Sequence, residues 1–252
     1  MLQDTAASSV DGGLLVGADV HKKFGALTVL DGVNFTLRER EAVGIVGPNG
    51  AGKTTLLNVL AGAYRPSAGT VYFKGGDVTT FDAAQRCRLG IARSHQIPRP
   101  FGGMTVFENC LVAATTGGGL SGQRAYQRCV ESLELCQMLH VANRRAETLG
   151  LLDRKRLELA RALTTEPRVL LLDEIGGGLT EEEANNLVET ILVLCGRGLA
   201  LVWIEHIVHV LVRVVERLIC LDAGRVIADG KPEAVIADAA VIDAYFGGKG
   251  ES

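Results

Sequence analysis

Apolar and polar positions follow two different rhythms along the 252-residue chain. Short apolar runs rich in β-branched residues recur near both ends and predict buried strands, whereas helical spacing dominates the middle. Strands that alternate with helices predict a parallel sheet whose faces are covered. The runs that predict strands are residues 14–20, 33–37, 42–46, 69–73, 91–94, 169–172, 199–204, 218–221 and 225–228.

Helical patterns separate these runs. They are clearest at residues 54–60, 82–88, 181–195 and 207–217. From Phe107 to roughly Arg161 the pattern is almost entirely helical, apart from a break at the three consecutive glycines 117–119. We therefore expect a helical subdomain at approximately 104–162, inserted into a single domain of residues 14–252. Residues 1–13 are small and polar, which predicts a flexible N-terminus.

A glycine-rich segment follows the apolar run 42–46 and precedes the helical pattern 54–60. In this arrangement backbone N–H groups curl around a polyphosphate, a lysine reaches the β- and γ-phosphates, and a hydroxyl binds Mg²⁺. The helix N-terminus adds its dipole to the anion site. The alternative is a glycine-rich turn without a ligand, which the complete order of strand, loop, lysine and hydroxyl argues against. The segment consists of Gly47, Pro48, Asn49, Gly50, Ala51, Gly52, Lys53, Thr54 and Thr55.

Two adjacent carboxylates, Asp173 and Glu174, end the apolar run that begins at Val169. The carboxyl ends of parallel strands face the ligand crevice. There Asp173 can hold Mg²⁺ through water, and Glu174 can polarise an attacking water. A strand that simply ends at a polar loop is the alternative, and the preceding phosphate-binding segment favours the functional interpretation.

His206 follows the run 199–204 and is expected at the same edge of the sheet. A neutral imidazole there can hydrogen-bond a γ-phosphate and the attacking water. His209 suggests zinc only weakly, since two histidines without further ligands do not make a metal site, and we interpret it as structural. Gln96 follows the run 91–94. Its amide oxygen can join a Mg²⁺ and water network, although spacing alone is equally typical of a solvated loop residue.

Composition narrows the classes of function. Charged residues make up 22% of the chain and the net charge is −3, which gives no electrostatic case for nucleic acid as a partner. No apolar run approaches the length of a membrane helix, and the start lacks the pattern of a secretory signal. A membrane role therefore requires partner subunits. The six cysteines form no C-x-x-C pair, so we expect reduced, mostly buried thiols.

These motifs, in this order, resemble the ATP-binding subunits of ABC transporters over almost the whole chain. Within that superfamily the chain looks most like the ATPases of branched-chain amino acid importers. The segments that carry this finer resemblance are residues 97–109, 203–206 and 241–247. The resemblance implies an α/β fold: a P-loop NTPase with a mostly parallel sheet, an N-terminal antiparallel β portion and an inserted helical subdomain.

The same resemblance implies roles and partners. Gln96 matches the Q-loop, His206 the switch histidine, and Phe24 the aromatic ring that stacks on adenine, although an ordinary core residue is the alternative for Phe24. ATP and Mg²⁺ are the implied cofactors. The implied partners are integral membrane permease subunits, a second ATPase subunit and, indirectly, a solute-binding protein. The expected location is peripheral, on the cytoplasmic face of the cell membrane.

One family motif is missing. The serine- and glycine-rich signature that precedes the helix at 156–163 is replaced here. Leucine side chains obstruct an approaching γ-phosphate, and a carboxylate adds negative charge near it. The segment 175–180 also lacks the usual proline at its start and the usual acidic or amide residue at its end. The degenerate signature consists of Leu149, Gly150, Leu151, Leu152 and Asp153.

ATP sites in this family are shared between two subunits, one giving the P-loop and the other the signature. We therefore expect a heterodimer, in which a partner with an intact signature completes this chain's P-loop side. Three other functions remain open: an ATPase subunit for uptake of urea, amides or other small solutes, a soluble ABC-type ATP switch, and a P-loop kinase for a small metabolite. The switch types usually have duplicated units or long coiled coils, and a kinase gives His206 no role.

Overall fold

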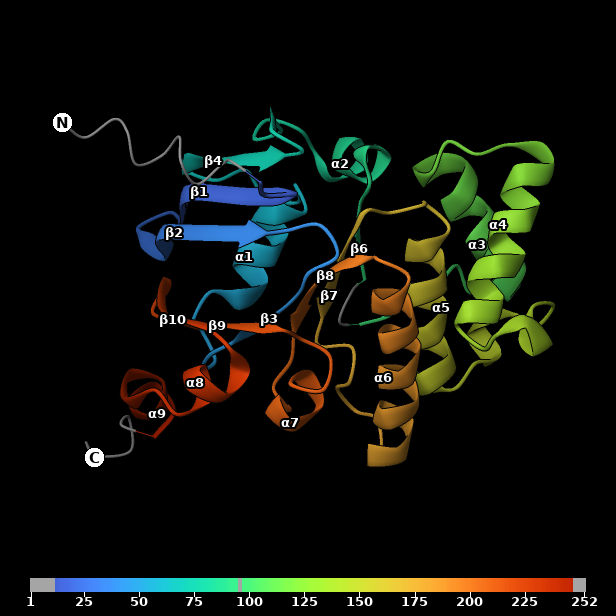
Figure 1. Ribbon diagram of the computed structural model, residues 1–252. Helices are drawn as coiled ribbons and strands as arrows, with labels where there is room; N and C mark the ends of the chain where they lie inside the picture. Colours follow the sequence, from blue (N-terminus) through green and yellow to red (C-terminus); the bar gives the residue numbers. More distant parts are fainter. Residues whose placement is uncertain (1–11, 95–96, 247–252) are drawn as a thin grey trace. The chain divides into compact units, whose positions relative to one another are not determined.

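The computed structural model describes residues 12–94 and 97–246 (Figure 1). The expectation of a flexible start at residues 1–11 lies outside these residues. The chain divides into two compact units. The first is formed by the described parts of Met1–Ala83 and Ala200–Ser252, and the second by Ala84–Leu199. The second unit is therefore inserted, in sequence, between the two halves of the first.

An antiparallel sheet opens the first unit, with strand order β2-β1-β4-β5. Leu15 pairs with Leu37 on one side and with Phe73 on the other, and its side chain is fully buried. The expected strand at 33–37 begins earlier, because a turn at Gly25 and Ala26 folds the chain back on β1. The strands are β1 (Leu15–Phe24), β2 (Leu27–Leu37), β4 (Ala68–Phe73) and β5 (Gly76–Asp77).

Parallel strands form the centre of the first unit. Strand β3 (Ala42–Val46) lies between β8 (Ala200–Ile204) and β9 (Arg217–Asp222) and runs parallel to both. Strand β10 (Arg225–Gly230) closes this group antiparallel to β9. All five residues of β3 are buried, as expected for a strand with neighbours on both sides and covered faces.

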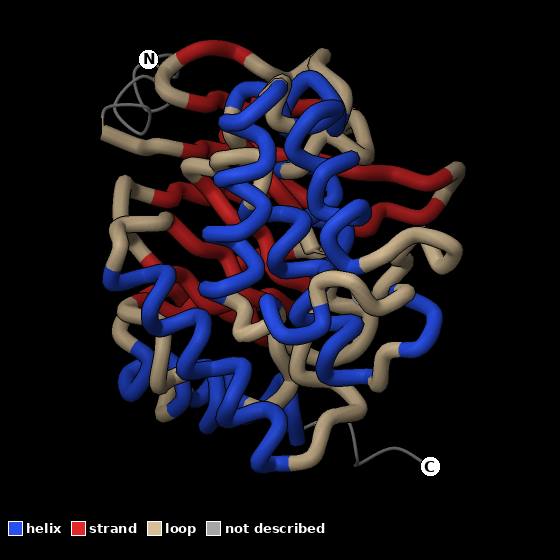
Figure 2. The backbone as a smooth tube through the Cα atoms, turned by 90° about the vertical axis from the view of Figure 1, so that its right-hand side faces the viewer, coloured by secondary structure: helices blue, strands red, loops and turns tan. Residues whose placement is uncertain are grey.

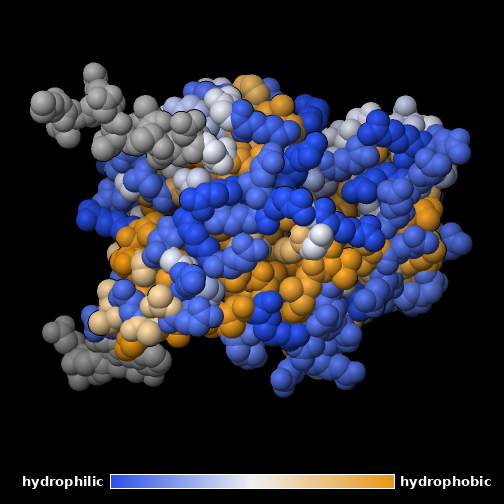
Figure 3. Space-filling view, viewed as in Figure 1, coloured by the Kyte–Doolittle hydropathy of each residue, from blue (hydrophilic) through white to orange (hydrophobic). Residues whose placement is uncertain are grey.

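The described part of the first unit contains four helices: α1 (Lys53–Leu60), α7 (Val208–Leu211), α8 (Pro232–Ile236) and α9 (Ala239–Phe246). The two C-terminal helices leave apolar side chains exposed, including Ile236 and Ile242. Hydrophobic surface is visible in the lower left of Figure 3, the region where α8 and α9 lie in Figure 1. Helix α8 packs on β9, and α9 packs on β10.

The helix expected at 207–217 is wrong in length. It ends at Leu211, and Arg217 instead opens β9. The guanidinium of Arg217 donates to Asp229 Oδ2 at 2.6 Å, to Glu41 Oε1 at 3.3 Å and to the Thr36 carbonyl at 2.9 Å. These long-range contacts fix the arginine in extended backbone, and the valine-rich segment before it has weak helix preference.

The second unit contains the parallel pair β6 (Ile91–Arg93) and β7 (Val169–Asp173). Helices α3, α4 and α5 pack against one another, and Figure 2 faces them. A π-helical turn follows α3. The helices are α2 (Ala83–Leu89), α3 (Val106–Val112), α4 (Gly122–Leu135), α5 (Leu151–Leu163) and α6 (Glu181–Gly196).

The middle of the chain is less continuously helical than expected. Between α4 and α5 the chain makes only two short 3₁₀ turns, Leu139–Val141 and Ala146–Thr148. The break begins at Gln137, whose φ is 57°, and the N–H of Met138 donates back to the Leu133 carbonyl. This left-handed helix end turns the fully buried Met138 into the core, a tertiary contact that helical spacing does not reveal.

The cysteines follow the expectation. All six lie in the described part of the chain and are free, and Cys110, Cys129 and Cys136 are fully buried in the helical region. Burial raises the pKa of Cys129 to about 11 and that of Cys136 to about 12, so both stay as neutral thiols at physiological pH. Over residues 12–94 and 97–246, no helix has the length and apolar character required to cross a bilayer.

Thr180, the residue that ends the unusual segment 175–180, has a local structural role. Its side chain accepts from the Glu183 N–H at 3.3 Å, and Glu183 accepts from the Thr180 N–H at 2.9 Å. This capping box begins α6. A threonine at this position is therefore explained by helix capping.

Replacing Thr180 with alanine should lower the free energy of unfolding by about 1 kcal/mol, because one helix N–H loses its partner. Urea denaturation measures the loss. Ser121→Ala is the matched control, since Ser121 precedes α4 without a side-chain capping bond. Equal effects of the two substitutions would contradict the capping role.

Candidate nucleotide site

The P-loop follows the buried strand β3 through a turn that has no room for a side chain at its first residue, Gly47. At Gly47, φ is 144°, and a Cβ would lie 2.0 Å from the Leu221 carbonyl oxygen of β9. At Gly50, φ is 83°, but a Cβ would meet nothing within 4 Å. The first glycine is therefore required by packing, whereas the second is required only by its backbone conformation and leaves open space in the loop.

Lys53 begins α1 with its side chain only 6% exposed. Its ammonium donates to the carbonyls of Gly47 at 2.7 Å and Pro48 at 3.0 Å, so it lies across the loop. Thr54 and Thr55 follow in the first turn of α1, which contains no acidic residue. An uncompensated positive helix end and a buried lysine together favour an anion here.

His206 lies at the same edge as the P-loop. Ile45 of β3 pairs with Ile204 of β8, so the two parallel strands end together; Gly47 directly follows β3, and His206 lies two residues after the end of β8. His206 is exposed, while Glu205 before it is 3% exposed. His209 is also exposed on α7.

Phe24 is not a core residue. It is 44% exposed at the end of β1 and meets the ring of Tyr64 edge-on, with centroids 5.4 Å apart. The Lys22 ammonium lies 4.9 Å from the Phe24 ring centroid and 5.6 Å from that of Tyr64. An exposed aromatic pair with a cation beside it suits stacking of a planar ligand better than core packing.

The acidic pair belongs to the second unit. Asp173 ends β7 with 1% exposure, and its Oδ2 accepts from the Arg93 guanidinium of β6 at 2.8 Å. Glu174 follows with φ at 47°, a left-handed backbone that is unusual outside glycine. Such backbone strain gathers at functional sites. The prediction for Gln96 lies outside the described residues.

Each unit contributes groups whose chemistry fits ATP and Mg²⁺. The open space at Gly50 and the helix end at Lys53 suit a phosphate chain. The Thr54 hydroxyl and the Asp173 carboxylate are the oxygen ligands that Mg²⁺ prefers.

The ABC transporter family model matches residues 30–176, more than half of the chain. The chain belongs to the ABC transporter family. A second model, described as a branched-chain amino acid ATP-binding cassette transporter, matches residues 225–251.

Relatives of this ABC chain include the high-affinity branched-chain amino acid transport ATP-binding protein LivG of Salmonella typhimurium. It is 37% identical over 240 residues, covering 89% of this chain and 94% of the relative. The probable LivG of Methanocaldococcus jannaschii is 30% identical, covering 91% and 95% of the two chains.

Solved structures of ABC cassettes share the fold. A nucleotide-free ATP-binding cassette from an ABC transporter is 28% identical, with a TM-score of 0.84 over 93% of this chain and 99% of the other. A dimeric bacterial ABC transporter cassette is 26% identical, with a TM-score of 0.78 over 86% and 98% of the two chains. The α/β P-loop fold expected from the sequence is confirmed.

The segment that we expect to be a degenerate signature forms the start of α5 in this ABC chain. Leu149 is buried, and Gly150 caps the helix without any side-chain hydrogen bond. Leu151 is 44% exposed in the first turn, Leu152 is half-buried, and Asp153 places a carboxylate there. A Cβ at Gly150 would meet nothing within 4 Å, so packing within this chain does not explain why the usual serine is missing.

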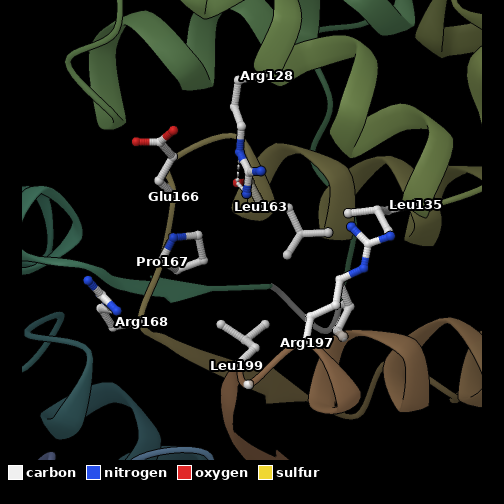
Figure 4. Close-up of a pocket in the computed structure, with 10 residues that line it drawn as sticks. Arg128, Leu135, Leu163, Glu166, Pro167, Arg168, Arg197 and Leu199 are labelled. Atoms are coloured by element: carbon white, nitrogen blue, oxygen red, sulfur yellow. Dashed lines mark hydrogen bonds between the residues drawn. The ribbon is translucent and has the colours of Figure 1, made fainter.

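A cavity of about 440 Å³ lies elsewhere in the second unit, and no predicted site residue lines it (Figure 4). Arg128 crosses one side and donates to the Leu163 carbonyl at 2.8 Å. Its lining residues are Arg128, Leu135, Leu163, Glu166, Pro167, Arg168, Leu194, Arg197, Gly198 and Leu199.

Sequence reasoning missed four residues at the candidate site: Lys22 and Tyr64 beside Phe24, Arg93 on Asp173, and Tyr245, whose hydroxyl accepts from the Gly47 N–H at 2.7 Å. An arginine in the short run 91–93, otherwise apolar, was a usable signal for a buried ion pair. Nothing in the local sequence points from Tyr245 to a glycine 198 residues away.

Gly47 and Gly50 should respond differently to alanine. Gly50→Ala should lower the free energy of unfolding by about 1–2 kcal/mol, the cost of left-handed backbone alone. Gly47→Ala should cost at least about 3 kcal/mol, because its Cβ collides with a carbonyl of β9 that cannot move aside. Urea denaturation without nucleotide compares the two. A smaller loss for Gly47→Ala would contradict the packing argument.

Proposed function

We propose that this chain is the ATP-hydrolysing subunit of an ABC importer for branched-chain amino acids. The observation that carries the proposal is the P-loop with Lys53 lying across it, at the edge where β8 delivers His206. The named relatives and the second family model support the class of solute.

In the proposed reaction, water attacks the γ-phosphate in line with the leaving oxygen. Lys53 turns from the loop carbonyls to the phosphates, where its charge and the loop N–H groups stabilise the transition state. Glu174 polarises the water, and the imidazole of His206 hydrogen-bonds the γ-phosphate. Mg²⁺, held by Thr54, Asp173 through water, and Gln96, would neutralise phosphate charge.

Arg93 holds the carboxylate of Asp173 by an ion pair. Its guanidinium donates to the carboxylate at 2.8 Å, and both side chains are almost withdrawn from solvent. A charged hydrogen bond at this distance fixes the orientation of the carboxylate. We infer that Arg93 positions Asp173, which would help to hold Mg²⁺.

The proposed partner ATPase follows from the start of α5. An anion at a helix N-terminus needs accessible N–H groups and no competing charge. Here Leu151 projects from the first turn and Asp153 already compensates the dipole. The segment at the start of α5 is therefore poorly suited to bind the γ-phosphate of a nucleotide held by a partner. A partner with an intact signature is needed to complete the site at this chain's own P-loop. Solved cassettes of the family form dimers.

The proposed permease contact lies in the loop after Gln96. Ile97 is 68% exposed and Phe101 is 45% exposed, an unusual exposure of large apolar side chains. The loop is nevertheless held firmly: Asn109 of α3 donates to and accepts from the Phe101 backbone, at 3.1 and 2.8 Å. Arg161 of α5 lies 5.1 Å from the Phe101 ring centroid. A rigid loop that presents apolar side chains is suited to passing motion to membrane subunits on the cytoplasmic face.

Glu174→Gln should bind ATP normally but hydrolyse it ~10²–10⁴-fold more slowly with the partner present, since the amide cannot polarise water. Lys53→Ala should instead weaken binding by roughly 10-fold or more, because a charged hydrogen-bond donor is lost. Titration with a fluorescent ATP analogue and phosphate release separate the two effects. Glu182→Gln, on the exposed face of α6, is the matched control. Wild-type turnover in Glu174→Gln would remove Glu174 from the mechanism.

The purified chain alone should hydrolyse ATP slowly and without cooperativity, because both shared sites of a homodimer contain the degenerate signature. Co-expression with a partner ATPase and permease subunits from the same gene neighbourhood should restore hydrolysis and co-purify all of them. Phosphate release at increasing protein concentration measures this. Fast, cooperative hydrolysis by the chain alone would rule out the obligatory heterodimer.

A further inference from the structure

The C-terminal helix α9 reaches the P-loop through one side chain. The Tyr245 hydroxyl accepts a hydrogen bond from the Gly47 N–H at 2.7 Å. Gly47 is the first P-loop glycine and directly follows the buried strand β3. Both residues belong to the first unit, so this contact lies inside one compact body.

Tyr245 is 40% exposed, and the covered part of its ring is held independently of its hydroxyl. It lines an apolar cavity of about 220 Å³ together with Val46, the residue before Gly47. The other lining residues come from β9 and from the helices α7, α8 and α9: Val208, Leu218, Val235, Ile236, Val241 and Ile242. Burial raises the pKa of the Tyr245 phenol, as expected for a partly desolvated hydroxyl. The packing of the ring therefore determines where the hydroxyl oxygen lies, and this oxygen accepts the hydrogen bond from the Gly47 N–H.

Gly47 is held from two directions. Its N–H donates to Tyr245, and its carbonyl accepts from the Lys53 ammonium at 2.7 Å. A bound nucleotide would affect these two hydrogen bonds differently. Lys53 gives up the carbonyl when it turns to a phosphate, whereas the Tyr245 hydroxyl keeps the Gly47 N–H and leaves the other loop N–H groups to the phosphate.

We propose that Tyr245 is a positioning residue for the P-loop. Its hydroxyl keeps the Gly47 peptide in the phosphate-binding orientation while Lys53 exchanges carbonyls for phosphates, and α9 thereby sets the affinity for nucleotide. This inference rests on the proposed function. It extends that function from the loop itself to a C-terminal segment that touches no reacting atom.

Tyr245→Phe tests the proposal because it removes the oxygen and keeps the ring in its cavity. Amide hydrogen exchange of the peptide spanning residues 43–49 should become roughly 3- to 10-fold faster, the factor expected for one lost hydrogen bond. Tyr126→Phe is the matched control, since Tyr126 is an exposed tyrosine on α4. Exchange at Gly47 unchanged by Tyr245→Phe would overturn the proposal.

Nucleotide binding provides the functional readout. In Tyr245→Phe, the Kd for a fluorescent ATP analogue and the KM for ATP with the partner present should rise by ~3- to 10-fold, with kcat nearly unchanged. A purely structural role would lower Tm and leave Kd and KM at their wild-type values, and that result would also overturn the proposal.

The two proposals fail in different ways. If the wild-type chain binds no magnesium nucleotide, the proposed function is wrong. Hydrogen exchange in Tyr245→Phe still tests whether the Tyr245 hydroxyl protects the Gly47 amide. If the wild type binds and Lys53→Ala weakens binding but Tyr245→Phe does not, the proposed function stands and the role of Tyr245 is wrong.

Discussion

A steric constraint at the end of β3 underlies the rest of the site. The chain must turn so close to β9 that a Cβ at Gly47 would lie 2.0 Å from a carbonyl oxygen. Only glycine allows this approach, and the approach delivers the following N–H groups and Lys53 to one place. The buried parallel strands on both sides of β3 make the constraint strict, because neither neighbour can move away without breaking the sheet.

The parts predicted from sequence are those whose signals are local. The buried strand before Gly47, the lysine at the start of α1 and the carboxylates after β7 are each encoded by adjacent residues. The parallel centre followed in the same way from short β-branched runs that alternate with helices, whereas the antiparallel start was expected only from the family resemblance. The departure from the family signature was expected from the resemblance, and in the structure Leu151 and Asp153 lie in the first turn of α5, which begins before the helical pattern at 156–163.

The parts that sequence did not predict depend on distant partners. Arg93 meets Asp173 across 80 residues, and Tyr245 meets Gly47 across 198. Arg217 lies in β9, where the carboxylates of Glu41 and Asp229 accept its hydrogen bonds, although the sequence around it has a helical pattern. Periodicity reports which face of an element is apolar, but it does not report which polar atom a remote side chain will satisfy.

The left-handed backbone at Glu174 has a consequence for protein engineering. Glycine adopts a φ of 47° without strain, so replacing the glutamate by glycine relieves about 1–2 kcal/mol of conformational energy. A library selected for heat resistance alone would therefore enrich glycine at this position and discard the carboxylate. Selection for thermal stability favours glycine at this position, whereas selection for catalytic turnover favours glutamate, and the wild-type sequence has the strained glutamate.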